Sequence, residues 1–451
     1  MVKKKASLAD QSAGTGKQTP QPKPSTKSTR PTALQPGARL TFLSGELIAN
    51  VDSARELFHT IIPILDAQDA VQEKLLIKVS KRVKEIKGRE RKALSHEVEQ
   101  ISNDLITFYN TFGRSNKLFR SNSVITLVSE YDDFVSHILK EILTLHPDRL
   151  KGSDKRISYG EAVQLASLDD LKSKFIDDEV DAVMRESHDE QFRYLEKLIN
   201  TDKLRDELGT WPKLIEVIER RNVCVHAGGI ISRQYLSVCK QHGIDLGNSK
   251  EGDRLKIDIA YYDEACDTVI ETAIKIAQTV VRKLLPQELG SADNFLTING
   301  VKLLMKERWA IALRLFDYAV RLPAKYVSDD ASRKIFLINK CIALKALGDK
   351  HAALDALKTV DWSAAEDKFK LALLVLRDEY SAAEKLMYKV GKGKGVRETA
   401  FRDWPLFRDF RRTEEFRRAF RRVFGKDYSV SAANAAREQM EELRQKLQKN
   451  R

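Results

Sequence analysis

The sequence has few cysteines, and their spacing predicts neither a disulfide framework nor a typical zinc site. Its four cysteines in 451 residues form no Cys-x-x-Cys pair, and a cytosolic protein would keep them reduced. Cys224, His226, Cys239 and His242 carry zinc-type ligand atoms. On one helix, however, Cys224 and His226 would point in nearly opposite directions. Buried or neutral cysteines are therefore the favoured interpretation.

The sequence also lacks long hydrophobic runs. No apolar stretch approaches the length of a membrane span, and the N-terminus has no apolar signal-peptide core. We therefore expect a cytoplasmic protein without membrane contacts. Carboxylates, cysteines and histidines do not cluster at metal-ligand spacing, so we expect neither a metal nor any other cofactor.

Positive charge is present in excess but is unevenly distributed. The chain carries a net charge of +13, of which residues 1–39 contribute +7 and residues 392–426 another +7, leaving −1 for the remainder. Any general attraction to polyanions therefore belongs to these two segments. With 42% hydrophobic and 32% charged residues, the whole chain has the composition of an ordinary soluble helical protein.

The composition and the hydrophobic periodicity change along the chain, and together they predict an all-α protein of several parts. Residues 1–39 form a basic, proline-containing tail, which we expect to be disordered and to act as an electrostatic tether or only as a solubilising leader. Residues 40–287 show helical periodicity throughout and are predicted to form one helical domain. Its first three long helices are expected around residues 51–65, 98–108 and 124–139, with a kink or break at Pro63.

Residues 295–390 show a different pattern, of helix pairs with small residues at recurring places. Residues 308–313 correspond to residues 349–354, and more weakly to residues 379–383. The consensus of tetratricopeptide repeats, which stack helix pairs and leave a groove for a partner, is resembled by Asn339, Ala343, Leu344, Leu347, Gly348 and Ala353. An irregular helical domain is the alternative.

The C-terminal residues combine aromatic and basic side chains. Residues 391–428 are expected to cap the repeats through their aromatic residues, and residues 429–451 to form a polar helix. Arg417, Arg418, Arg421 and Arg422 form a dense cationic stripe. This stripe is either a solvated helix face or a surface that binds RNA or acidic partners.

The most informative stretch is residues 219–229, at the end of a predicted helix. Thr210 is a suitable N-cap and Pro212 fits the first turn, while Gly228 and Gly229 favour a helix end. The helical spacing of its apolar residues predicts one buried face, made by Leu214, Val217, Ile218 and Val225.

The polar residues of this stretch suit chemistry on a phosphodiester. Asn222 and His226 are four residues apart, so the amide could fix the tautomer of the imidazole. Arg221 supplies a permanent guanidinium charge that grips phosphate, beside an imidazole that titrates near neutral pH. The alternative is that Arg221 and His226 only complement the negative end of the helix dipole.

The string Arg221-Asn222-x3-His226, followed by two glycines, resembles the Arg-x4–6-His signature of the HEPN superfamily. Ala227 departs from the resembling branch, where a polar residue is common. The resemblance implies an all-helical, homodimeric fold. Many members of the family are metal-independent RNA endonucleases whose Arg/His pairs meet across the dimer interface, and others keep the fold without demonstrated cleavage.

We therefore expect a homodimeric RNA endonuclease with Arg221, Asn222 and His226 as its catalytic residues. In this interpretation His226 is the general acid/base, Arg221 stabilises the phosphate charge, and Asn222 positions His226 or the RNA. One alternative is a catalytically silent dimer whose repeats bind a protein partner. Another is nucleotide binding without cleavage.

Overall fold

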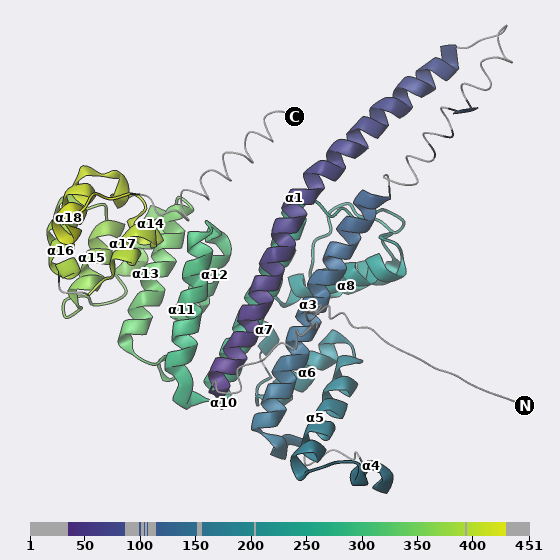
Figure 1. The fold of residues 1–451 in the computed structure, drawn as a ribbon, viewed down its shortest axis with the longest axis horizontal. Coiled ribbons are helices and arrows are strands. Elements are labelled where there is room, and N and C mark those ends of the chain that lie inside the picture. The colour runs from purple at the N-terminus through teal and green to yellow at the C-terminus, as the bar shows by residue number, and fades with distance from the viewer. Residues whose placement is uncertain are drawn as a thin grey trace, which may run out of the picture. The chain divides into compact units, whose positions relative to one another are not determined.

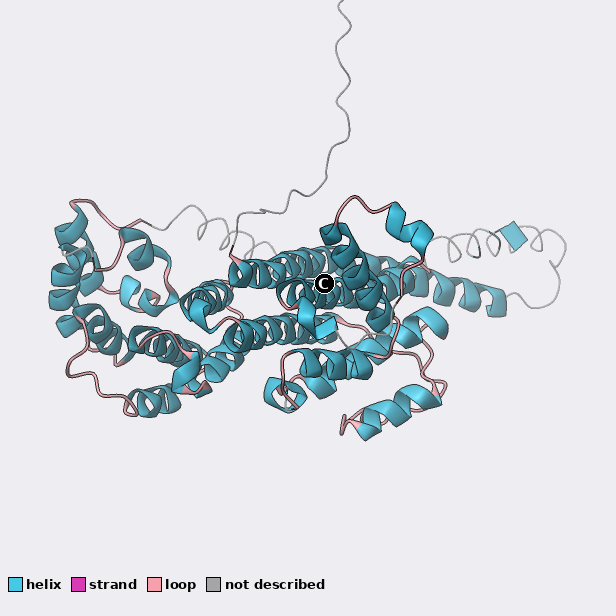
Figure 2. Ribbon diagram, turned by 90° about the horizontal axis from the view of Figure 1, so that it is seen from below, coloured by secondary structure: helices cyan, strands magenta, loops and turns pink. Residues whose placement is uncertain are grey.

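A computed structural model gives the structure of the chain and describes residues 35–85, 99–100, 103, 106, 114–150, 156–202, 204–392 and 395–429. All of the regular elements in these residues are helices, which confirms the predicted all-α class (Figures 1 and 2). A single antiparallel bridge between Ile230 and Arg254 is the only β-type pairing within the same residues. None of the described helices combines the length and the apolar character needed to cross a bilayer.

The first half of the fold is built from long helices and shorter ones that cover them. The long helices are α1 (Pro36–Glu85), α3 (Ser115–Leu145) and α10 (Ile259–Leu284). The shorter elements are η2 (Pro147–Leu150), α4 (Tyr159–Val163), α5 (Leu168–Met184), α6 (His188–Leu198), α7 (Leu204–Leu208), α8 (Trp211–His226) and α9 (Arg233–Gln241).

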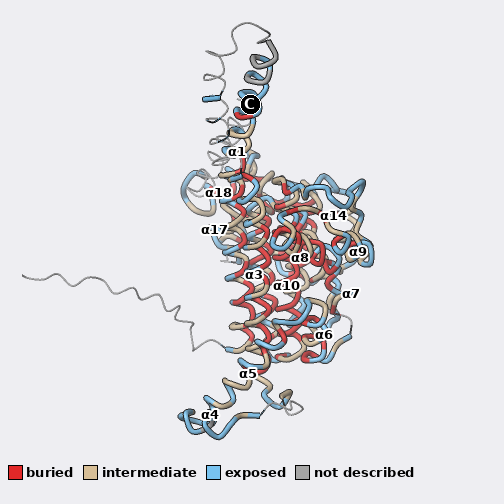
Figure 3. Tube along the Cα trace, turned by 90° about the vertical axis from the view of Figure 1, so that its right-hand side faces the viewer, coloured by how far each residue is buried: buried red, intermediate tan, exposed pale blue. Residues whose placement is uncertain are grey.

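Helix α10 lies at the centre of these contacts. It packs against α1, α3, α7, α8, α11 and α12. Its side chains from Ala265 to Arg282 are almost all buried, as the mainly red trace of α10 indicates in Figure 3. Polar side chains on a helix that is buried on every side need hydrogen-bond partners inside the protein. Thr272, Lys275 and Gln278 each form hydrogen bonds within this core.

Helix α1 differs from the expected start and break. It begins at Pro36, inside the segment assigned to the tail, because Leu40 is buried and the backbone N–H of Gly37 donates to Glu288 at 2.9 Å. It also continues through Pro63 without a break in the helix assignment. Residues 1–34 and most of the second predicted helix, around residues 98–108, lie outside the described residues.

Serine side chains cap the starts of two helices in this half of the fold. The Ser167 side chain accepts a hydrogen bond from the backbone of Asp170 at the start of α5. Ser158 and Glu161 satisfy each other's backbone N–H groups at the start of α4, which is the reciprocal pattern of a capping box.

The second half of the described chain consists of helix pairs followed by short helices. The pairs are α11 (Leu289–Met305) with α12 (Trp309–Arg321), α13 (Asp330–Ala346) with α14 (Lys350–Leu357), and α15 (Asp367–Leu376) with α16 (Tyr380–Lys392). The connecting and terminal elements are η3 (Pro286–Glu288), η4 (Ala324–Tyr326), α17 (Glu398–Asp403), η5 (Pro405–Phe407), η6 (Phe410–Arg412) and α18 (Glu414–Phe424).

The turns within the three pairs have the same geometry. Glu307, Gly348 and Asp378 each adopt a left-handed backbone, with φ of 57°, 92° and 64°. In each turn the residue that follows donates its N–H to a leucine carbonyl five residues earlier, at 3.0, 3.0 and 2.9 Å. These three positions are the ones that the sequence correspondence places in register. The recurring pattern in the sequence therefore corresponds to one turn geometry that occurs three times.

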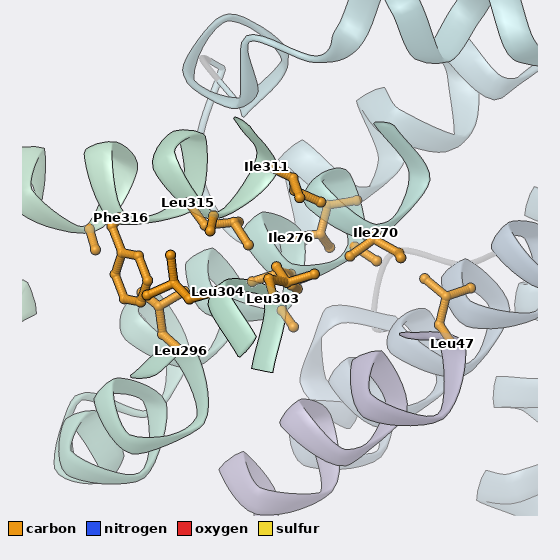
Figure 4. Close-up of a cluster of buried hydrophobic side chains, with 14 of the residues drawn as sticks. Leu47, Ile270, Ile276, Leu296, Leu303, Leu304, Ile311, Leu315 and Phe316 are labelled. Carbon is orange, nitrogen blue, oxygen red and sulfur yellow. The ribbon is translucent and has the colours of Figure 1, made fainter. Parts of the chain in front are cut away.

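The hydrophobic core passes from the first half into the helix pairs. Figure 4 shows Leu47 of α1 and Ile270 and Ile276 of α10 in one cluster with apolar residues of α11 and α12, namely Leu296, Leu303, Leu304, Ile311, Leu315 and Phe316. After α16, the aromatic residues Phe401, Phe407, Phe410, Phe416 and Phe420 are buried in the same continuous core. The predicted boundary between residues 287 and 295 stays a prediction, as does the polar helix of residues 429–451, where only residue 429 is described.

Candidate functional site

Helix α8 begins and ends where the sequence predicts, but the side chain at its N-cap position does not form the expected capping hydrogen bond. Pro212 lies in the first turn, and Thr210 occupies the N-cap position. The Thr210 hydroxyl makes no capping bond and instead shares a buried hydrogen bond of 2.7 Å with Thr272 of α10. This bond anchors the start of α8 to the central helix of the fold.

The end of α8 is a glycine turn. Gly228 and Gly229 have φ of 56° and 82°, a left-handed conformation that glycine adopts at little cost. The Val223 carbonyl accepts from the N–H groups of Ala227 and Gly229, at 3.0 and 3.1 Å. The turn therefore stops the helix directly after His226.

Val225 corrects the predicted buried face of α8. Leu214, Val217 and Ile218 are buried as expected, but the Val225 side chain is 48% exposed. Val223 and Cys224 are buried in its place, because α9 covers the side of α8 that carries Val223, which packs with Tyr235 and Cys239, and Cys224 faces the main core. The last turn of α8 therefore exposes an apolar side chain next to His226.

Arg221 is held by a carboxylate from another helix. Its guanidinium donates to Asp132 of α3 at 3.0 Å and to the side-chain oxygen of Asn222 at 3.0 Å. The Arg221 and Asp132 side chains are 24% and 27% exposed, so the pair is reachable from solvent. A guanidinium has five N–H groups, and these bonds leave others available for a phosphate.

The same carboxylate binds His188, the first residue of α6. Nε2 of His188 lies 2.9 Å from the other oxygen of Asp132. Asp132 therefore joins α3, α6 and α8 at one point and places a second imidazole beside Arg221. This leaves Nδ1 of His188 as the ring nitrogen that the carboxylate does not contact.

His226 stands apart from this cluster. It is exposed on the last turn of α8, and its ring makes no hydrogen bond or ion pair within the described part of the chain. The Asn222 amide, which was expected to orient it, donates to Glu219 at 3.2 Å and accepts from Arg221. The structure thus brings Arg221 and Asn222 together and leaves His226 free to meet another molecule.

Arg220, the neighbour of Arg221, belongs to a buried network. It pairs with Glu216 at 2.7 Å and stacks on Tyr261, with its guanidinium carbon 3.6 Å from the ring centroid. The hydroxyls of Tyr235 and Tyr261 donate to the two oxygens of Glu216, at 2.7 and 2.9 Å. Both charges are therefore hydrogen-bonded inside the protein, which is the condition for burying them.

This network shifts the protonation of its members. Burial and the nearby Glu216 carboxylate raise the pKa of Tyr235 above its usual range. Burial alone would lower the pKa of Arg220, but Tyr261 and Glu216 outweigh it and raise that pKa. Burial, together with Glu216, raises the pKa of Cys239 to about 12. These groups therefore keep their protons at neutral pH, and their contacts with Glu216 hold α8 against α9 and α10.

Two cavities adjoin the glycine turn. One, of about 220 Å³, is lined by Gly229, Lys117 and Arg120, and the other, of about 390 Å³, by Arg220, Tyr235 and Lys256. Arg254 and Leu255 line both. The exposed Arg254 side chain donates to the Gly228 carbonyl at 3.3 Å, so a solvent-exposed cation lies directly beside the end of α8.

The arginines of α18 are largely occupied by local partners. Arg417 pairs with Glu414 at 2.6 Å, Arg418 with Glu384 at 2.9 Å and Arg421 with Asp427 at 2.5 Å. Arg422 lies over the Tyr388 ring, 4.1 Å from its centroid. The stripe is therefore an exposed helix face with partly compensated charge, and RNA binding there stays a prediction.

The cysteines do not form a metal site in the described residues. Cys224, Cys239, Cys266 and Cys341 are all buried free thiols. Across the described ranges, no group of three or more His, Cys, Asp or Glu side chains is arranged to hold a metal ion. The absence of a cofactor stays an expectation from the sequence.

Asp132, His188 and Glu216 are the site residues that sequence reasoning missed. Asp132 lies 89 residues before Arg221 in the chain, and no motif marks it or His188. Glu216 precedes Arg220 by four residues, and that spacing could have indicated their pairing. No protein-family model, curated protein sequence or solved structure matches the chain.

Proposed function

We propose that the protein is a metal-independent RNA endonuclease that acts as a homodimer through the end of α8. The observation that carries the proposal is the last turn of α8. There, Arg221 is held by a carboxylate from α3, and the exposed His226 follows one turn later. The resemblance of Arg221-Asn222-x3-His226 to the HEPN signature supports the same assignment.

Arg221 is suited to hold the scissile phosphate. Asp132 and Asn222 fix its guanidinium on one side, and its remaining N–H groups can donate to phosphate oxygens. Cations around the glycine turn, Arg254 and Lys117 among them, can bind neighbouring phosphates of the RNA backbone.

His226 is suited to move protons. In RNA cleavage the 2′-oxygen attacks phosphorus, the bond to the 5′-oxygen breaks, and a 2′,3′-cyclic phosphate forms. One imidazole accepts the 2′-hydroxyl proton and a second group protonates the leaving 5′-oxygen. The nucleophile comes from the RNA, so these steps require only protein side chains.

One chain offers few groups for both proton transfers, and a second copy would supply another Arg221 and His226. The exposed Val225 beside His226 supports a contact between two chains at this point, because burying it would remove apolar surface from water. In such a dimer the two α8 ends would lie close together.

The decisive experiment compares wild-type protein with His226→Ala on a defined RNA in the presence of excess EDTA. We expect cleavage by the wild type with 2′,3′-cyclic phosphate ends, and a rate about 10²–10⁴-fold lower in the variant. His351→Ala is the matched control, because His351 is an exposed histidine on α14, with Asp355 as its local partner. Cleavage that EDTA abolishes and magnesium restores would contradict the proposal.

Val225→Asp tests the dimer separately. Because Val225 is exposed, the substitution should leave the fold intact while placing like charges at the contact. Sedimentation should show a dimer for the wild type and a monomer with little cleavage for the variant. A wild-type protein that is monomeric at micromolar concentration and fully active would exclude this arrangement.

A second candidate function is a catalytically silent scaffold that binds a protein partner. The specific observation in its favour is the repeated turn at Glu307, Gly348 and Asp378, which accords with tetratricopeptide-like helix pairs. Intact RNA after incubation with the wild type at dimer-forming concentrations would favour the scaffold over the nuclease.

A further inference from the structure

A cavity of about 480 Å³ lies away from the end of α8, where α7, α10, α12 and η4 meet. Its size is within the range of cavities that hold small organic ligands. Its walls carry Lys275, Arg282 and Lys283 from α10 and Arg321 from α12, together with Tyr318 and Tyr326. None of these residues takes part in the proposed cleavage site.

Lys275 is a buried cation on this wall. Its side chain is 8% exposed, and its ammonium donates to the Leu208 carbonyl and to Glu271, both at 2.6 Å. An ammonium has three N–H groups, so these two bonds leave one. Glu271 also pairs with Arg314 at 2.5 Å, so one carboxylate serves two cations and a positive charge is left over.

Arg321 and Lys283 add further uncompensated charge. The partner of Arg321, Asp317, is shared with Lys340 at 2.7 Å, so again one carboxylate serves two cations. Lys283 has no hydrogen bond or ion pair among the residues that the structure describes. Arg282, by contrast, is matched by Asp293 at 2.8 Å. Among these residues Lys283 is thus unpaired, and Lys275 and Arg321 each share one carboxylate with a second cation, so their paired acids balance the cations of the wall only in part.

The cavity also carries features that suit an organic group. Tyr318, Tyr326, Leu322 and Pro323 provide aromatic and apolar surface. The exposed carboxylates of Asp206 and Glu207 on α7 can accept hydrogen bonds from hydroxyl or amino groups, and they reduce the net positive charge. An inorganic anion would contact only the cations and would leave these apolar and acidic side chains unused.

We propose that this cavity binds a small phosphate ester. The phosphate would lie against the cations of α10 and α12, and the organic part would pack against the two tyrosines and donate to the α7 carboxylates. The inference does not depend on RNA cleavage, because it uses other residues and a measurement of binding alone.

The test is isothermal titration of the full-length protein with adenosine 5′-monophosphate, inorganic phosphate and adenosine. We expect saturable binding of the monophosphate and at least tenfold weaker binding of each of its two parts. Equal binding of adenosine would overturn the role of the phosphate, and equal binding of inorganic phosphate would overturn the role of the organic part.

Two substitutions locate the site. Lys283→Glu and Arg321→Glu should each weaken binding of the monophosphate by about tenfold, because each reverses a charge on the wall without removing a buried group. Lys302→Glu on α11, an exposed lysine outside the cavity, is the matched control and should bind normally. No saturable binding at millimolar concentration, or equal weakening by all three substitutions, would overturn the proposal.

Discussion

The end of α8 and the helix pairs of the C-terminal half obtain their polar contacts in different ways. At the end of α8, Arg221 finds its carboxylate on α3, 89 residues earlier in the chain. In the C-terminal half, many partners are close in sequence, as with Arg417 and Glu414, and the same short turn occurs three times. The first contact depends on how distant helices pack, and the second kind depends on spacing along one helix.

This difference shows why a cluster of cations does not by itself indicate a site. The arginines of α18 are denser in sequence than those of α8, but their ion pairs are largely exposed and therefore contribute little. Arg221 is fixed by a residue on a different helix, and a fixed guanidinium is what phosphate chemistry needs. The four predictions below test this contrast, beginning with the largest effect.

Arg220→Met should destabilise the protein most. It would leave Glu216 buried with only its two tyrosine donors, and breaking such a pair costs about 3–5 kcal/mol in the free energy of unfolding. Arg221→Met should cost about 1 kcal/mol or less, because that pair is partly exposed, yet it should abolish cleavage. Urea unfolding and RNA cleavage of the two variants, measured side by side, separate the roles. Equal loss of stability would contradict the contrast.

Asp132→Asn should lower the rate of RNA cleavage about tenfold. The neutral amide keeps the shape of the side chain but weakens the hold on Arg221 and His188, which loosens the position of the guanidinium. Single-turnover cleavage at saturating RNA measures this effect. Glu384→Gln, which removes the carboxylate from Arg418 on α18, is the matched control and should leave the rate unchanged.

Asp378→Asn should cost about 1 kcal/mol of stability at neutral pH and less in acid. Burial opposes ionisation of Asp378, but hydrogen bonds from Lys345, Lys350 and Tyr380 outweigh it and lower its pKa to about 2. A lowered pKa means that the carboxylate stabilises the fold above its ordinary pKa, near 4, and loses this effect as the pH falls through 2. Thermal unfolding at pH 7 and pH 2.5 should show the difference between wild type and variant shrinking. A constant difference would mean that the charge is not involved.

The smallest effect is expected at the basic segments. Removing residues 1–34 leaves α1 intact, and replacing Arg417, Arg418, Arg421 and Arg422 by glutamine removes four exposed charges. Affinity for RNA should fall about threefold at low salt and less at high salt, with the cleavage rate at saturation unchanged. Filter binding at two salt concentrations measures this. Unchanged affinity at low salt would assign these segments to solubility or protein docking.

The sequence by itself determined the helical class, the two ends of α8 and the register of the turns in the C-terminal half. These features depend on residues close together in the chain, such as Ser167 capping α5 or the glycines that end α8. Even Glu307 and Asp378, which are not glycine, take the turn geometry that the alignment with Gly348 implies. The exposure of Val225 was not predicted, because the helical period does not say where the covering elements end.

Only the tertiary structure decided which of two adjacent arginines is buried and which is presented. Arg220 and Arg221 are equivalent in sequence, but the packing of α8 turns one toward Glu216 and Tyr261 and the other toward Asp132 of α3. The same packing brought His188 to Asp132 and left His226 exposed. The physical reason is that the positions of α3, α6 and α8 follow from how all of their apolar faces are buried together in one core, and no local pattern contains that information.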